Sequence, residues 1–313
     1  MFYHIIDHNG FGTMHKLIMP LCGSDSNHKI VIYDNIGELR NIANDNNAHI
    51  IIHSTASKKS NFIYDFLKYF SDRQVYIFMH VSVQYELYKG RSDVINYLKY
   101  LCDNYKVTVL TPSSEVTKQY IDCGIKAATI QLGIDRSRIG IYVENNQNLL
   151  PYYGRIITTC SSDNDEYKYI KGIDLYQRFI LENELSDLSL IAGTNNTGNI
   201  ELSCKKFSEA DFLNILAHSL MYVQFSRFES YNITAAYAKM FKVPTLLLNT
   251  EGTFSCMNGR VYNSYDELEA EALNILKGVL NYDMLEELYC DGEKRENLEN
   301  FKESFEKTIR GYA

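Results

Sequence analysis

Short apolar runs alternate with amphipathic segments through the first 135 residues of the chain. The apolar runs are rich in β-branched residues and too short for helices, which is typical of strands buried on both faces of a parallel sheet. The predicted strands are Phe2–Asp7, Lys29–Tyr33, Ala48–His53, Gln74–His80, Lys106–Thr111 and Ala127–Leu132. The predicted helices are Ile36–Asn44, Ser60–Phe70, Ser92–Tyr105 and Ser114–Cys123. This alternation predicts a doubly wound α/β domain.

The segment Asp135–Tyr153 breaks the rhythm with a polar run, VENNQN, followed by a proline, and we interpret it as a linker. Strands are then predicted at Arg155–Thr159, Leu188–Ala192, Leu220–Phe225 and Pro244–Leu248. Helices are predicted at Ile173–Leu185, Glu209–His218, Asn232–Lys242, Tyr265–Leu280 and from Met284 to the end. We therefore predict two facing Rossmann-like α/β domains, residues 1–140 and 141–313, with a cleft between them. The last helix is long enough to reach back across the first domain.

Composition and charge exclude several classes of protein. Hydrophobic residues make up 45% and charged residues 22% of the 313 positions, which is a globular balance. The formal net charge is −8, and the longest basic runs are pairs such as Lys58–Lys59 and Lys205–Lys206. Nucleic acid is therefore not expected as a partner. A small anionic ligand remains compatible with this charge, because a local group of N–H donors suffices to bind a phosphate.

The seven cysteines are scattered, with no CxxC pair and no His-Cys cluster at zinc spacing. This pattern predicts reduced thiols packed as small apolar residues and no metal site. The N-terminal sequence MFYHIIDHNG lacks the features of a signal peptide, and no run of about 18 apolar residues occurs. We expect a cytoplasmic protein, with peripheral docking on the inner face of a membrane left open.

Loops that follow strands are the first places to look for a ligand, because open α/β sheets bind ligands beyond the carboxyl ends of their strands. Gly10 and Gly12 lie in such a loop, DHNGFGT, where the backbone can approach a ligand closely. This is half of a dinucleotide fingerprint, since position 15 is His rather than a third glycine. The loop either contacts a ligand or is an ordinary tight turn.

Two histidines stand at the ends of predicted strands. His80 ends QVYIFMH, and His53 takes the equivalent place one strand earlier. A histidine at a strand tip can donate a hydrogen bond to a substrate hydroxyl or phosphate and titrates near neutrality. A purely structural role is the alternative for both, and position favours His80 over His53.

An acidic residue, Glu229, follows the strand that ends near Ser226 and precedes a helix rich in small residues that starts near Asn232. Considered alone, Glu229 would be interpreted as a capping carboxylate. The whole segment, SRFESYNITAAYAKMFKVPTLLLNTEGTF, nevertheless resembles the donor-site signature of the retaining GT-B glycosyltransferases of family 4.

Three further segments resemble the same family in the same order. VLTPSSEVTKQYIDCGI with TIQLGID resembles the end of its first domain, and RIITTC with IKGIDLYQRF the start of its second. LSLIAG and SEADFLNILAHSLMYVQFS also fall in the family's order. The resemblance covers about residues 106 to 280 and is weaker before them, where only the Gly10/Gly12 loop and His80 match.

The resemblance implies roles for the matching residues. Glu229 would contact hydroxyls of the donor sugar, and His80 would face the transferred sugar from the first domain. Lys171 would balance the charge of the departing diphosphate without a metal or other cofactor. The set implied near the donor sugar and its phosphates also comprises Ser230, Asn232, Ile233, Tyr237 and Thr253.

Three positions depart from the family pattern. Tyr237 stands where the family has a second Glu that holds the nucleotide ribose, and Ser230-Tyr231-Asn232 replaces a Gly-aromatic-Gly turn. No Arg precedes the Lys171-Gly172 pair in TTCSSDNDEYKYIKG, although Lys168 offers a point charge without a bidentate grip.

The implied function is transfer of a hexose-type sugar, with retention, from a nucleotide-sugar to a glycan, lipid-linked or protein-bound acceptor in a surface-polysaccharide or glycoprotein pathway. Two alternatives remain open at this point. The departures favour a catalytically degenerate GT-B protein that acts as a binding or partner subunit. A GT-B sugar-nucleotide epimerase is less favoured, because its expected acidic and His residues are not evident.

Overall fold

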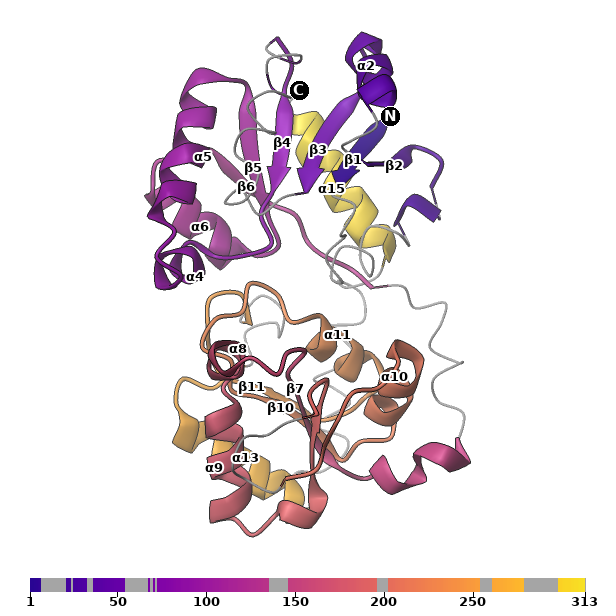
Figure 1. Ribbon diagram of the computed structural model, residues 1–313, viewed down its shortest axis with the longest axis vertical. Helices are drawn as coiled ribbons and strands as arrows, with labels where there is room; N and C mark the ends of the chain where they lie inside the picture. The colour runs from indigo at the N-terminus through magenta and orange to yellow at the C-terminus, as the bar shows by residue number, and fades with distance from the viewer. Residues whose placement is uncertain are drawn as a thin grey trace. The chain divides into compact units, whose positions relative to one another are not determined.

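The computed structural model describes residues 1–6, 21–23, 25–32, 36–53, 67, 70, 72–134, 146–195, 202–253, 261–278 and 298–312. The chain divides into two compact units (Figure 1). The N-terminal unit comprises residues 1–135 together with 296–313, and the C-terminal unit comprises residues 136–295. The C-terminal segment of the chain thus belongs to the N-terminal unit.

The N-terminal unit is built on one sheet of parallel strands in the order β2-β1-β3-β4-β5-β6. The strands are β1 Phe2–Ile6, β2 His28–Ile32, β3 His49–His53, β4 Val75–Phe78, β5 Val107–Thr111 and β6 Ala127–Thr129. All six predicted strands are therefore present. Strand β2 keeps its predicted length but begins one residue earlier, and the other five are one to three residues shorter than predicted.

The described helices of this unit are α2 Ile36–Asn44, α4 Val83–Tyr88, α5 Ser92–Asn104, α6 Ser114–Asp122 and α15 Leu298–Tyr312. The Ser113 hydroxyl caps α6 by accepting a hydrogen bond from Val116 N, and Gly124 follows that helix with a φ of 74°. The predicted helix Ser60–Phe70 lies largely outside the described residues, and α4 was not predicted.

Alternate side chains of the N-terminal sheet enter two different layers. Ile5, Val31 and Ile52 pack into a core with apolar residues of α2, α5 and α6. The opposite face meets α15, drawn in yellow in Figure 1, whose Phe305 ring lies 6.4 Å from the ring of Phe2. Both faces of the sheet are thus covered, which explains the continuous apolar runs of its strands.

The face toward α15 carries a row of buried histidines from three adjacent strands. His4 of β1 lies between the other two, with its Nδ1 2.9 Å from His53 Nε2 and its Nε2 2.9 Å from His28 Nδ1. His80, two residues beyond β4, lies next along the row with its ring 5.7 Å from that of His53. Burial lowers the pKa of His80 to about 3, and burial with the charges of His4 and His80 lowers the pKa of His53.

These histidines should make the N-terminal unit sensitive to acid. A buried His whose folded pKa is depressed binds its proton only in the unfolded state, so its stabilising effect is complete above about pH 6.5 and is lost as pH falls below it. For His53 we expect a slope of about 1.4 kcal/mol of unfolding free energy per pH unit. Urea unfolding between pH 7 and 5 measures this slope.

The variant His53→Gln should flatten the acid limb of this profile, whereas His218→Gln, a half-buried His of the C-terminal unit, should leave it unchanged. An acid limb of equal slope in wild type and His53→Gln would contradict the assignment.

The C-terminal unit contains a second parallel sheet in the order β11-β10-β7-β8-β9. Its strands are β7 Ile156–Thr159, β8 Ser189–Ala192, β9 Cys204–Lys205, β10 Met221–Gln224 and β11 Thr245–Leu247. Its described helices are η3 Gln147–Tyr152, α8 Asp165–Ile170, α9 Ile173–Glu182, η4 Ser186–Leu188, α10 Glu209–Ala217, α11 Ile233–Met240 and α13 Tyr265–Leu276. The two-residue strand β9 and the helices η3, η4 and α8 were not predicted.

This sheet also lies between two layers of helices. Ile157, Tyr222 and Leu247 pack with residues of α10 and α11 on one face. Ile156 and Val223 pack with residues of α9 and α13 on the other. The expected fold class, α/β with two Rossmann-like halves, is confirmed for each unit.

Candidate functional site

The strand order of the C-terminal sheet reverses between β7 and β10. From β7 the chain proceeds to β8 and β9 on one side, whereas β10 and β11 lie on the other side. The loops that leave β7 and β10 therefore diverge, and ligands of open α/β sheets bind at such a point. At this edge Thr159 Oγ1 donates a hydrogen bond of 3.0 Å to Gln224 Oε1, which joins the ends of the two strands.

Lys171 stands at the sharp corner between α8 and α9. Helix α8 ends at Ile170, and Gly172 adopts a left-handed conformation with a φ of 66°. A Cβ on Gly172 would clash with the carbonyl group of Phe225, just beyond β10. Gln224 Nε2 donates a hydrogen bond of 2.8 Å to the carbonyl oxygen of Lys171. The end of β10 therefore fixes the backbone from which the Lys171 side chain extends.

Arg227 holds the same corner from its other side. Its backbone N–H donates to the carbonyl of Ile170 at 2.8 Å. Its guanidinium group forms two 2.7 Å bonds to the carboxylate of Asp174 and lies 3.9 Å above the ring of Tyr169. Bidentate pairs of this kind define geometry as well as charge. This arginine is thus engaged in holding the corner.

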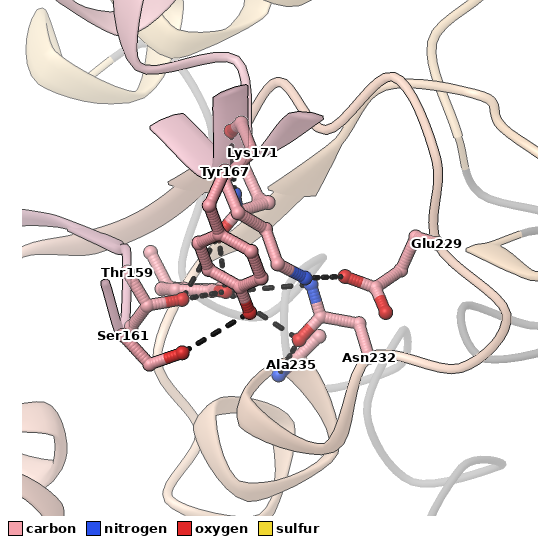
Figure 2. Close-up of polar contacts among 9 residues, drawn as sticks. Thr159, Ser161, Tyr167, Lys171, Glu229, Asn232 and Ala235 are labelled. Carbon is pink, nitrogen blue, oxygen red and sulfur yellow. Dashed lines mark hydrogen bonds and ion pairs between the residues drawn. The ribbon is translucent and has the colours of Figure 1, made fainter. Parts of the chain in front are cut away.

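The Lys171 ammonium group forms an ion pair with Glu229, with Nζ 2.6 Å from Oε2 (Figure 2). The Lys171 and Glu229 side chains are only 19% and 10% exposed. Burial alone would lower the pKa of Lys171, but Glu229 and the nearby Tyr167 raise it by more, so its pKa lies above the usual range. The site thus holds a permanent cation directly beside a carboxylate.

The loop that carries Glu229 is held by the loop after β11. Gly252 N donates a hydrogen bond of 2.7 Å to the Glu229 carbonyl oxygen, and a Cβ on Gly252 would clash with the Ser230 carbonyl group. Thr253 braces this second loop, because its hydroxyl accepts from Thr250 N at 2.9 Å and donates to the Leu248 carbonyl at 3.0 Å. Thr253 is buried and organises this backbone.

Asn232 links the Glu229 loop to the interior of the sheet. Its Oδ1 accepts a hydrogen bond of 2.9 Å from Ala235 N and so caps α11 (Figure 2). Its Nδ2 donates to the Tyr222 hydroxyl at 3.3 Å, and that hydroxyl donates to Gln224 at 2.8 Å. Burial raises the pKa of Tyr222 to about 12, so its hydroxyl keeps its proton at neutral pH.

Six of the residues implied by the resemblance lie in the C-terminal unit, on loops and helix ends beyond the strands of its sheet. They are Lys171, Glu229, Ser230, Asn232, Ile233 and Thr253. Tyr237 lies farther along α11, where its ring stacks on Phe241 and packs against the core. It offers no carboxylate in place of the second Glu.

The other three implied residues belong to the N-terminal unit. His80 follows β4 and is part of the histidine row, whereas Gly10 and Gly12 lie outside the described residues. Their roles stay predictions.

Sequence reasoning missed four residues that shape the site: Thr159, Tyr167, Tyr222 and Arg227. The Tyr167 hydroxyl accepts a 3.0 Å hydrogen bond from Ser161, and its ring lies 5.9 Å from Lys171 Nζ (Figure 2). Thr159 could have been found from the sequence, because a polar residue at the end of a buried strand lies at the edge of the sheet where ligands bind. Tyr167 lies on a helix that was not predicted, so its position could not be assigned.

Comparison with solved structures identifies the fold of this chain. No family model matches the chain, and a search of curated proteins found no match to its sequence. Solved structures do match. HepE of Anabaena in complex with UDP aligns with a TM-score of 0.74 at 10% identity, over 99% of this chain and 100% of that one. The trehalose-6-phosphate synthase OtsA aligns with a TM-score of 0.66 at 13% identity, over 88% of this chain and 76% of that one.

A third match is a UDP-forming α,α-trehalose-phosphate synthase of Burkholderia xenovorans, with a TM-score of 0.65 at 11% identity. It covers 89% of this chain and 76% of that one. At these identities the similarity concerns the fold. The expected resemblance to GT-B glycosyltransferases is confirmed at that level, and the chain has the GT-B fold.

Proposed function

We propose that this protein is a glycosyltransferase that transfers a hexose-type sugar from a nucleotide-sugar donor, with retention of configuration. The observation that carries the proposal is the Lys171–Glu229 ion pair, placed at the strand-order reversal of a GT-B C-terminal unit. A cation suits a diphosphate at this place, and a carboxylate suits the hydroxyls of a sugar.

Lys171 supplies the charge that sugar transfer requires. When the bond between the sugar and the diphosphate breaks, negative charge accumulates on the leaving phosphate oxygen, and a fixed cation lowers the barrier most when it is placed before the reaction. The tight packing of Gly172 against Phe225 and the Arg227–Asp174 bond fix the backbone that carries Lys171. The raised pKa of Lys171 keeps its ammonium group charged. In this proposal no metal ion or other cofactor is required for the transfer.

Glu229 orients the donor sugar. Its carboxylate accepts hydrogen bonds from sugar hydroxyls while Lys171 holds it in place. The amino end of α11, which begins just after Asn232, adds N–H groups and a positive dipole end for the phosphates. Ser230 and Ile233 flank this end, and the Thr253 loop supports it.

The acceptor is proposed to be a glycan, a lipid-linked glycan or a glycoprotein, met in the cytoplasm or at the inner face of a membrane. None of the helices in the part of the chain that the structure describes has the length and apolar character needed to span a bilayer. Contact with a lipid-linked acceptor would therefore involve surface docking of the described elements.

A second candidate function is that of a degenerate GT-B subunit that binds a partner or a nucleotide without turnover. The observation that favours it is the ring of Tyr237, which packs against Phe241 where a ribose-binding carboxylate is expected. Arg227 is bonded to Asp174, so in this second reading it does not serve as the phosphate-binding arginine that the family has before the lysine.

A panel of UDP-, GDP- and dTDP-sugars with the full chain, in EDTA and without acceptor, separates these functions. A transferase should show a higher melting temperature with one nucleotide-sugar and slow release of its sugar, because water replaces the acceptor. Stabilisation without any release would support the degenerate subunit, and no stabilisation by any donor would contradict the proposed transferase. An epimerised sugar nucleotide would instead identify an epimerase.

A further inference from the structure

Three metal-ligating side chains converge in the N-terminal unit. Asp25 lies just before β2, His28 is the first residue of β2, and Glu306 lies on α15. One ligand atom from each residue lies within 4.8 Å of the others. Asp25 and His28 are buried, at 8% and 3% exposed, and Glu306 is half-buried. This cluster is therefore part of the contact between the sheet and the C-terminal helix.

The neighbours of the cluster hold its side chains in fixed orientations. His28 Nδ1 faces His4 Nε2 at 2.9 Å, so an ion would be bound through His28 Nε2. The N–H of Asn27 donates to Asp25 Oδ1 at 2.9 Å and fixes that carboxylate. Histidines that bind metals generally carry such a partner on their other ring nitrogen. Glu306 has an ion pair with Arg310 at 3.1 Å through Oε2, and its second oxygen can bind an ion while that pair persists.

We propose that Asp25, His28 and Glu306 bind a divalent transition-metal ion, for which Zn²⁺ is the appropriate probe. One imidazole nitrogen and two carboxylate oxygens match the ligand types of Zn²⁺, whereas Mg²⁺ prefers oxygen ligands and retained water. Three protein ligands leave a further position for water. The three ligand atoms already lie within 4.8 Å of one another, close to the separation of about 3–4 Å that a tetrahedral Zn²⁺ requires.

Such an ion would join α15 to the edge of the sheet that contains β1 and β2. Residues far apart in the sequence form the site only in the folded chain, so binding stabilises the fold rather than the unfolded chain. This explains why spacing along the sequence gave no sign of a metal site. The inference does not rest on the proposed transferase function, because all three ligands belong to the N-terminal unit.

The ion would also set the direction of the hydrogen bonds along the histidine row. An ion on His28 Nε2 requires the proton of that ring to reside on Nδ1, which then donates to His4 Nε2. His4 in turn carries its proton on Nδ1 and donates to His53 Nε2. Metal binding at one end thus fixes the tautomers of His28 and His4.

Zn²⁺ titration of the chelator-stripped full chain tests the site by calorimetry and by melting temperature. Wild type should bind one equivalent of Zn²⁺. Glu306→Gln and His28→Gln should bind Zn²⁺ at least tenfold more weakly. Glu303 is an exposed acid on the same helix, and Glu303→Gln should behave as wild type. Cys22 lies near Asp25, and its thiol is an alternative Zn²⁺ ligand. Cys22→Ser should keep the equivalent, and Mg²⁺ should not replace Zn²⁺. Equal affinity in Glu306→Gln and wild type, loss in Cys22→Ser alone, or no binding by folded wild type would overturn the proposal.

Nitrogen-15 NMR of the histidine rings gives a second readout, which does not depend on activity or stability. With Zn²⁺, His28 should show a metal-bound Nε2 and a protonated Nδ1, and His4 a protonated Nδ1. In Glu306→Gln the same changes should require at least tenfold more free Zn²⁺. A His28 ring protonated on both nitrogens with Zn²⁺ present would instead show that the cluster is a histidine–carboxylate ion pair without a metal.

Discussion

Replacing Glu229 by Ala should lower sugar release and transfer by about 10²–10³-fold, the loss typical when one preorganised polar group is removed from a reaction site. The change removes the proposed contact with the sugar hydroxyls and frees the Lys171 ammonium group, whose Nζ lies 2.6 Å from Glu229 Oε2. Because the pair is mostly buried and the change leaves the Lys171 charge uncompensated, we expect the unfolding free energy to fall by about 2–3 kcal/mol, less than for a fully buried pair. Initial rates with the donor found in the nucleotide panel measure the first effect, and urea unfolding the second.

Two further variants determine whether this loss reflects the site. Glu182→Ala removes a Glu that is paired with Arg178 in the same unit but is 51% exposed, and its activity should match wild type. Lys171→Ala should weaken binding of the nucleoside diphosphate, since the leaving group loses its cation. Unchanged turnover in Glu229→Ala, or unaltered diphosphate affinity in Lys171→Ala, would contradict the proposed roles.

The sheets could be predicted from sequence because their strands are buried on both faces. All ten apolar runs became strands, since burial of a whole run leaves little ambiguity about its type. The elements that were missed are those that lack such a run. Cys204–Lys205 is a strand of two residues at a sheet edge, and α8, Asp165–Ile170, is short and mostly polar. Its cap, Asn164, stands in a run of turn-forming residues that resembles a loop.

The candidate site could be predicted only in part, because its geometry depends on contacts between distant residues. Lys171 and Glu229 are 58 positions apart, and the resemblance assigned each a role without indicating that they form an ion pair. Arg227 was visible in the sequence, but its bidentate bond to Asp174 depends on the corner after α8. The histidine row was missed because only His53 and His80 were singled out from the sequence, and nothing in the sequence indicated that His4 and His28 lie beside His53.

Gly172→Ala should be the most destabilising single substitution proposed for the C-terminal unit. Gly172 has a φ of 66°, and a Cβ at this position would clash with the Phe225 carbonyl group, which belongs to backbone and cannot rotate away. The left-handed conformation and the clash together should cost about 4 kcal/mol or more of unfolding free energy, in the range that marks exceptional substitutions. Urea unfolding gives the value, and calorimetry with the nucleotide should show weaker binding, since the same corner carries Lys171.

Gly154→Ala is the matched control for this prediction. Gly154 has nearly the same φ, 64°, in the same unit, but no atom would lie within 4 Å of its added Cβ. Its substitution should therefore cost only the strain of a left-handed alanine, about 1–2 kcal/mol, and should leave nucleotide affinity unchanged. The difference in unfolding free energy between the two variants measures the contribution of the contact between Gly172 and the Phe225 carbonyl group. Equal costs would show that this contact is loose, and the placement of Lys171 would then need another explanation.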